Sequence, residues 1–179
     1  MSNTIDILCV IDAATLAAKV ASGSISAGTQ ANPTSLGSYS QSDTYVSMLT
    51  EGSYITNDKD GSELTITCDV GDNIRWTITN PGAGVNYSCM LYQFSSASIG
   101  TSVSPPICLP LGVNLYINSA SPNTSTPKPL AYTSSAWQTT ALGAVPSPGV
   151  QYSWAFQLIN QSGTVLGYFS WDPFIIINV

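Results

Sequence analysis

The sequence of 179 residues contains no histidine. The most common general base of enzymes is therefore missing, together with the Ser–His–Asp and Cys–His arrangements of nucleophilic catalysis and the metal sites that use imidazole. Chemistry that uses carboxylates or lysine alone is still open. The absence favours a protein that is not an enzyme and needs no cofactor.

Charged residues are scarce as well. They make up 8% of the chain, against about a quarter in an average soluble domain. Four Lys and Arg stand against ten Asp and Glu, which gives a net charge of -6. Binding to nucleic acid needs clustered cations, so we expect neither a nucleic acid nor an anionic membrane as a partner. Weak charge repulsion between copies favours self-association into a homo-oligomer.

No apolar run approaches the roughly 20 residues needed to span a bilayer. The opening segment MSNTIDILCVID lacks the basic region, long apolar stretch and cleavage site of a secretory signal peptide. We therefore predict a cytoplasmic protein. The cysteines include no Cys-x-x-Cys pair, so in this compartment they are expected to be free buried thiols rather than disulfides or a zinc site. They are Cys9, Cys68, Cys89 and Cys108.

Apolar and polar residues alternate in many short segments separated by turn residues, which is the pattern of half-buried β-strands. Such segments lie at residues 5–11, 44–50, 62–68, 73–79, 85–94, 137–142, 151–160 and 167–179. Residues 13–21 are rich in alanine and follow Asp12, a suitable N-cap, so they predict one short helix. The turn at 161–163 predicts a hairpin between the last two segments.

This pattern predicts a single domain over residues 1–179. Its fold class is all-β: an antiparallel β-sandwich, jelly-roll-like, with one short helix near the N-terminus. A barrel is the alternative.

Residues 95–135 are rich in Ser, Pro, Thr and Asn, with one apolar island at 111–117. A loop of this length inside a compact domain is expected to be either functional or a packing arm. The aromatic residues in or beside it, Trp137, Tyr132 and Tyr116, are the candidate carbohydrate-binding residues, because the faces of sugars stack on aromatic rings.

Three other tryptophans are expected in the core. Trp76, Trp154 and Trp171 alternate with polar residues inside predicted strands.

The segment NDKDGSE at residues 57–63 suggests a calcium site at Asp58 and Asp60. When Gly61 is aligned with the glycine of an EF-hand loop, both ends of the loop lack the required ligands. A turn at Asp60 and Gly61 is therefore favoured over calcium binding.

The single arginine, Arg75, is expected to pair with Asp69 or Asp72 and hold a loop, in preference to binding a ligand.

Two carboxylates facing each other across a pocket could hydrolyse a glycoside, which is the weakest of the hypotheses. The candidates are Asp6, Asp12, Asp72 and Asp172.

The chain ends in GYFSWDPFIIINV, residues 167–179. Pro173 has no N–H for a ladder, so a bulge is expected at Asp172 and Pro173 within one closing strand.

Five segments together resemble the AidA/PixA inclusion body protein family of bacteria. They are IDILCVID, GSELTITCDVGDNIRW, NYSCMLYQF, SPP (104–106) and YFSWDPFIIIN, in the order and spacing of the family. The signature residues are Asp72, Arg75, Trp76, Trp171, Asp172 and Pro173. The resemblance implies an abundant cytoplasmic protein, which in some members accumulates in inclusions under quorum-sensing or stationary-phase control. It brings no catalytic residues.

The favoured hypothesis is thus a non-enzymatic, self-associating protein of the inclusion body type. The alternative is a lectin-like carbohydrate-binding module that uses the loop aromatics, with or without calcium.

Overall fold

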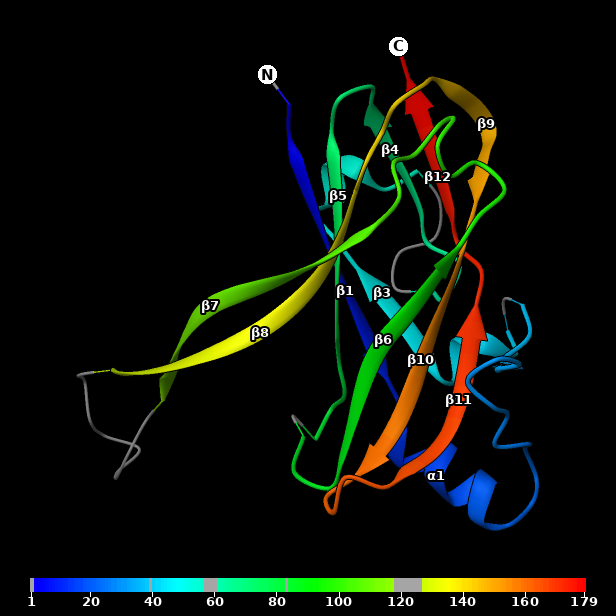
Figure 1. The fold of residues 1–179 in the computed structure, drawn as a ribbon, viewed down its shortest axis with the longest axis vertical. Coiled ribbons are helices and arrows are strands. Elements are labelled where there is room, and N and C mark those ends of the chain that lie inside the picture. The colour runs from blue at the N-terminus through cyan, green and yellow to red at the C-terminus, as the bar shows by residue number, and fades with distance from the viewer. Residues whose placement is uncertain (1, 39, 57–60, 83, 118–126) are drawn as a thin grey trace.

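The structure is a computed structural model that describes residues 2–38, 40–56, 61–82, 84–117 and 127–179 (Figure 1). Most of these residues lie in β-strands, which form three sheets, and one α-helix lies near the N-terminus. The prediction of an all-β fold with one short helix is confirmed.

The largest sheet has five strands in the order β3-β1-β5-β8-β7. They are β1 (Thr4–Ile11), β3 (Val46–Leu49), β5 (Asn73–Thr79), β7 (Ile107–Ile117) and β8 (Lys128–Thr140). β1 and β5 run parallel, whereas the other neighbours are antiparallel. The predicted antiparallel pairing thus holds for most neighbours but not for β1 and β5, because alternation of side chains sets which face of a strand is buried and not the direction of its neighbour.

Two smaller sheets have the orders β2-β11-β10-β6 and β4-β12-β9. Their strands are β2 (Thr34–Ser35), β6 (Tyr87–Ser95), β10 (Ser153–Asn160), β11 (Val165–Trp171), β4 (Thr65–Asp69), β9 (Val145–Gln151) and β12 (Phe174–Asn178). β2 is parallel to β11 and β4 is parallel to β12. Because β9 leads into β10 and β11 into β12, the two small sheets are continuous along the chain.

The C-terminal segment is therefore two strands in different sheets, not one closing strand with a bulge. Asp172 and Pro173 form the crossing between them. The carbonyl of Pro173 accepts a hydrogen bond from the backbone amide of Tyr152 at 3.1 Å, and the side-chain Nε2 of Gln151 donates to Asp172 Oδ2 at 2.7 Å. A proline fits at this position because the chain is leaving one ladder for another.

The helix α1 (Ala13–Ala21) begins as the sequence predicts, since the Asp12 carboxylate accepts a hydrogen bond from the amide of Thr15 at 3.0 Å. Two short 3₁₀ turns, η1 (Ser42–Thr44) and η2 (Gly52–Tyr54), flank β3. In the described part of the chain, no helix has the length and hydropathy that crossing a membrane requires. The predicted hairpin of β10 and β11 is also present.

The segment predicted as a long loop, residues 95–135, lies mostly in strands where the structure describes it. β7 and β8 form an antiparallel hairpin with register from Ile107 opposite Gln138 to Ile117 opposite Lys128. Proline at position 110 indicated a loop, yet β7 is the edge strand of its sheet, where proline is tolerated. β9 was missed for the same reason, because it carries two prolines and is an edge strand of the three-stranded sheet.

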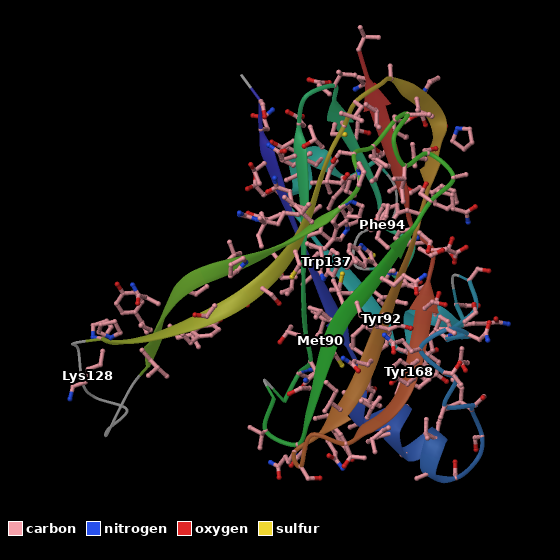
Figure 2. All side chains as sticks on the ribbon, in the orientation of Figure 1. Met90, Tyr92, Phe94, Lys128, Trp137 and Tyr168 are labelled. Atoms are coloured by element: carbon pink, nitrogen blue, oxygen red, sulfur yellow. The ribbon has the colours of Figure 1, made fainter. Side chains whose placement is uncertain are left out.

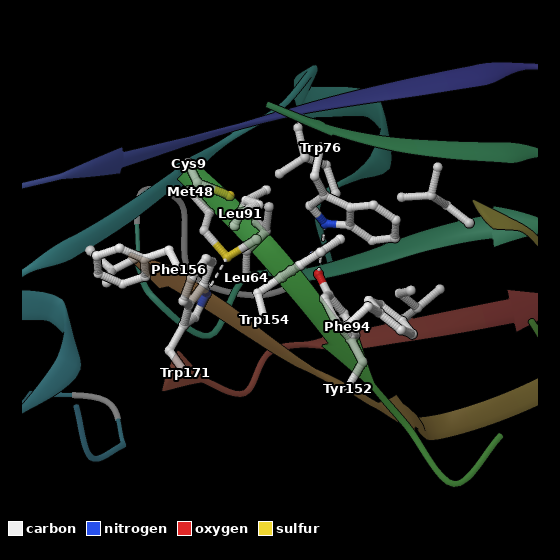
Figure 3. Packing of buried hydrophobic residues seen from close by; sticks show 14 of the residues in the cluster. Cys9, Met48, Leu64, Trp76, Leu91, Phe94, Tyr152, Trp154, Phe156 and Trp171 are labelled. Carbon is white, nitrogen blue, oxygen red and sulfur yellow. Dashed lines mark hydrogen bonds between the residues drawn. The ribbon is translucent and has the colours of Figure 1, made fainter. Parts of the chain in front are cut away.

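The core lies where the sheets face each other, and aromatic residues fill its centre (Figure 3). Trp76 on β5 is fully buried, and its ring centre lies 5.4 Å from those of both Tyr152 and Trp154. Its indole N–H donates to the hydroxyl of Tyr152 at 3.1 Å. Trp154 and Trp171 are buried too, so the predicted placement of all three tryptophans in the core is confirmed.

Asp72 is a buried structural carboxylate. It accepts hydrogen bonds from the amides of Asn3, at 2.7 Å, and Asp69, at 3.0 Å, and so fixes the start of β1 to the turn before β5. Arg75 pairs through two nitrogens with Asp6 on the neighbouring strand, at 2.5 and 2.8 Å. The expected structural pairing of Arg75 is present, but its partner is Asp6 rather than Asp69 or Asp72.

The proposed calcium residues Asp58 and Asp60 lie outside the described residues. The turn expected at Asp60 and Gly61 is outside them in part.

The two aspartates give a first prediction. Asp72→Ala leaves two amides without their acceptor in a buried place, so we expect the free energy of unfolding to fall by about 2 kcal/mol or more. Asp6→Ala removes an ion pair whose carboxylate is 61% exposed, and is expected to cost less than about 1 kcal/mol. Urea denaturation of both variants measures the difference. Equal losses of unfolding free energy in the two variants would contradict the structural role assigned to Asp72.

The second prediction concerns the hydrogen bond between the layers. Tyr152→Phe removes the acceptor of the Trp76 indole inside the core and is expected to cost about 1–3 kcal/mol. Tyr116→Phe, at a residue 67% exposed, is the matched control and should leave stability unchanged. A midpoint of urea denaturation equal to that of the unmodified protein would show that Trp76 does not depend on this contact.

Candidate functional site

The hairpin of β7 and β8 projects from the rest of the molecule (Figure 1). β8 pairs with β5 from Thr140 back to Trp137, which lies opposite Trp76, and among the described strands it then pairs with β7 alone. We call residues 109–116 and 129–136 the arm. A two-stranded ribbon with no further support is marginally stable in water.

The two faces of the arm differ in chemistry. Residues that are opposite each other in an antiparallel pair point to the same side of the ribbon. By the register, one side, which we call the apolar face, carries Leu109, Leu111, Val113, Leu115, Leu130, Tyr132 and Ala136, with Ser134 as its polar member. The other side carries Pro110, Gly112, Asn114, Tyr116, Pro129, Ala131, Thr133 and Ser135.

The apolar face is open to solvent toward its tip. Leu115 is 48% exposed, Leu130 51% and Tyr132 42%, whereas Ala136 at the base is buried. Large apolar side chains with such exposure, adjacent on one side of a ribbon, are typical of a contact surface.

A groove of about 470 Å³ lies between the base of the arm and the strands β5 and β6. Its apolar floor and walls include Trp76, Ile78, Cys89, Met90, Leu91 and Trp137, and the arm adds the hydroxyls of Thr133, Ser134 and Ser135. None of the described residues that line it is charged. Figure 2 shows Trp137 at the base of the arm and Met90 on the facing strand.

Trp137 connects the arm to the opposite layer. Its indole N–H donates to the carbonyl of Leu91 on β6 at 3.2 Å, and its ring centre lies 5.6 Å from that of Trp154. Its polar atom is thus committed to the fold, and its ring is half-buried.

The structure brings together two of the three predicted ligand-binding residues. Trp137 and Tyr132 both line the groove. Tyr116 lies opposite Pro129, eight residues and therefore about 27 Å along the strand from Trp137. It belongs to the far end of the arm and cannot share a small ligand with the other two.

Two strand edges border the groove. One belongs to β6, the outermost strand of its sheet. The other belongs to β5, which after Trp76 is paired with β1 but, among the described strands, no longer with β8. Side chains cover part of the β6 edge, because Asn80 donates to the carbonyl of Tyr87 at 2.8 Å and Trp137 donates to that of Leu91. The rest of such an edge is available for pairing with another strand.

Cys89 and Cys108 also line the groove. The prediction of buried free thiols is confirmed for Cys9 and Cys68, whereas Cys89 is half-buried and Cys108, on the edge strand β7, is exposed. Burial raises the pKa of Cys89 to about 12, so this thiol is protonated at neutral pH and is not a nucleophile.

The four candidate catalytic carboxylates are engaged separately. Asp6 binds Arg75, Asp12 caps the helix, and Asp72 accepts two amides. Asp172 accepts a hydrogen bond from Gln151, and its partial burial raises its pKa. Each hollow found among the described residues contains at most one of the four.

Over the same described residues, no three His, Cys, Asp or Glu side chains lie close enough to hold a metal ion.

Sequence reasoning missed the apolar face and the residues of the groove on β5 and β6. The face had a signal, since ICLPLGVNLYI at 107–117 alternates apolar residues without a break. The groove left no signal in the sequence, because strands that are distant in the sequence form it.

Comparisons with known proteins agree with this fold. No curated protein matches the chain. Among solved structures, the crystal structure of the inclusion body protein PixA from Burkholderia cenocepacia J2315 has a TM-score of 0.73. It is 19% identical, and the match covers 99% of this chain and 97% of that one. The sequence also matches the family described as PixA, inclusion body protein, over residues 3–177. This chain belongs to the PixA family of inclusion body proteins.

Proposed function

We propose that this protein is a non-enzymatic, self-associating cytoplasmic protein that acts through assembly, as the name of its family suggests. The observation that carries the proposal is the combination of a surface poor in charge with exposed apolar side chains. Of twelve large hydrophobic residues found exposed in the described chain, five lie on β7 and β8. They are Ile107, Leu115, Tyr116, Leu130 and Tyr132.

Assembly by such a surface depends on concentration. Burial of apolar area drives association, and few charges oppose it, so high expression shifts the equilibrium toward oligomers by mass action. A protein that is stored in inclusions needs this property more than it needs a pocket for chemistry. The structural duties of the candidate carboxylates support the same view, because each one holds the fold at a different place.

A third prediction follows. In sedimentation velocity from about 1 µM to about 100 µM protein, the average mass is expected to rise above that of one chain. Because the surface carries few charges, raising the salt concentration from about 0.05 M to about 1 M should not dissociate the oligomer. A strict monomer across this range contradicts the proposal.

A lectin-like module is the second candidate function. It is favoured by the groove, whose described lining includes the aromatic residues Trp137 and Tyr132 together with Thr133 and Ser135, which carry hydroxyls. Aromatic faces with a few convergent polar groups are the usual composition of a site for a small polar ligand.

The fourth prediction tests this candidate with a glycan array and titration calorimetry, with calcium or with EDTA. If the groove binds sugar, Tyr132→Ala abolishes the signal, whereas Tyr116→Ala, at an exposed tyrosine outside the groove, retains it. Absence of binding by the unmodified protein to any glycan removes the lectin hypothesis.

A further inference from the structure

We infer that the apolar face of the arm packs into the groove of a second copy of this chain, and that the second copy returns the same contact. The inference rests on the proposed self-association and specifies its interface. The result is a homodimer with two-fold symmetry, in which each arm lies across the other subunit.

Over the residues that the structure describes, the arm lacks the packing that would make it stable in a single subunit. Residues 109–116 and 129–136 form a ribbon two strands wide, with apolar side chains on one side and, among the described residues, no second layer over its outer part. Ribbons of this kind need a hydrophobic face that is packed against another element. Strict alternation over the whole length of β7 specifies such a face, although the described part of one subunit does not cover it.

The groove matches the apolar face of the arm in chemistry. It offers apolar side chains, including Ile78 and the exposed Met90, next to the open edge of β6. Neither the arm nor the described lining of the groove carries a charge. An uncharged apolar ribbon therefore meets an uncharged apolar groove, and no charge has to be removed from water when they join.

The buried area distinguishes two arrangements of the dimer, arm against arm and each arm in the groove of the other subunit. Eight residues of strand are about 27 Å long, and a ribbon of two strands is about 10 Å wide, so one face projects onto about 270 Å². Two arms packed on each other would bury about 540 Å² in total, which is below the range of about 1,200–2,000 Å² for stable interfaces.

In the reciprocal exchange, each arm lies in the groove of the other subunit, so two arms and two grooves are covered. By the same projection this buries about 1,100 Å² in total, without the additional area of side chains that protrude from the ribbon. Exchange therefore exceeds the roughly 1,000 Å² that a specific interface should bury and approaches the range of stable ones, whereas arm against arm reaches only half of that area. The contact is also self-complementary, as a two-fold interface requires, because each subunit supplies one arm and one groove.

As a fifth prediction, sedimentation velocity of a variant altered at one cross-strand pair of the arm tests the inference. Leu115 and Leu130 are opposite each other on the apolar face and are about half exposed. The double variant Leu115→Asn, Leu130→Asn is expected to weaken dimerisation by about tenfold or more, with an unchanged melting temperature for the monomer. The matched control is Tyr116→Asn, which removes a more exposed side chain from the opposite face and should retain the dimer.

A disulfide experiment locates the arm. In a Leu130→Cys variant, the introduced thiol is seven residues, or about 24 Å, along β8 from the position opposite Cys108. A disulfide needs Cα atoms within about 7 Å, so a link to Cys108 can form only between two copies. Mild oxidation followed by peptide mass spectrometry is expected to show this link, and Cys108→Ser should abolish it.

The outcomes separate the two proposals. If the unmodified protein is a monomer, both the self-association and the exchange are wrong. If it associates but the double variant associates equally well, self-association holds and the arm inference is overturned. A disulfide between two introduced thiols, with none to Cys108, indicates arm against arm and overturns the placement in the groove.

Discussion

The packing of Trp76 between the layers is the contact on which the rest of the structure depends. The ring is fully buried on β5 and touches Tyr152 and Trp154 of the opposite layer. Because Tyr152 joins β9 to β10, this contact holds both smaller sheets against the five-stranded sheet. Trp76 is also the last residue of β5 that pairs with β8, opposite Trp137. The same cluster that closes the core therefore fixes the point where the arm leaves the molecule.

The arm and the shortage of charge have a common consequence. An ordinary soluble domain buries the apolar faces of its sheets and presents charged side chains to water. The repulsion between these charges keeps copies of the protein apart. This chain instead extends a ribbon with one apolar face and places an uncharged groove at its base. Membership in the PixA family of inclusion body proteins gives these features a common purpose, which we propose to be assembly from many copies.

Alternation in the sequence was sufficient to predict the interior, because burial and capping depend on near neighbours. Alternation placed Trp76 in the core, and the N-cap preference of aspartate placed Asp12 at the start of the helix. The direction of paired strands and the change of sheet after β11 depend on distant residues, and alternation does not encode them. Residues 107–117 alternate as a strand should, but Pro110 and the flanks rich in Ser and Pro indicated a loop. The sequence indicated Trp137 as a candidate ligand-binding residue, whereas the groove around it could be identified only from the folded structure.

Hydrogen–deuterium exchange of the arm amides, followed as a function of protein concentration, tests the central claim most directly. If the arm is covered by a second copy, amides of residues 109–116 and 129–136 exchange more slowly as concentration rises, and those at the edge of β6 follow the same curve. The core strands β1 and β10 serve as the internal reference, since their exchange should not change. Arm amides that exchange at one rate at every concentration, while the protein associates, would contradict the account.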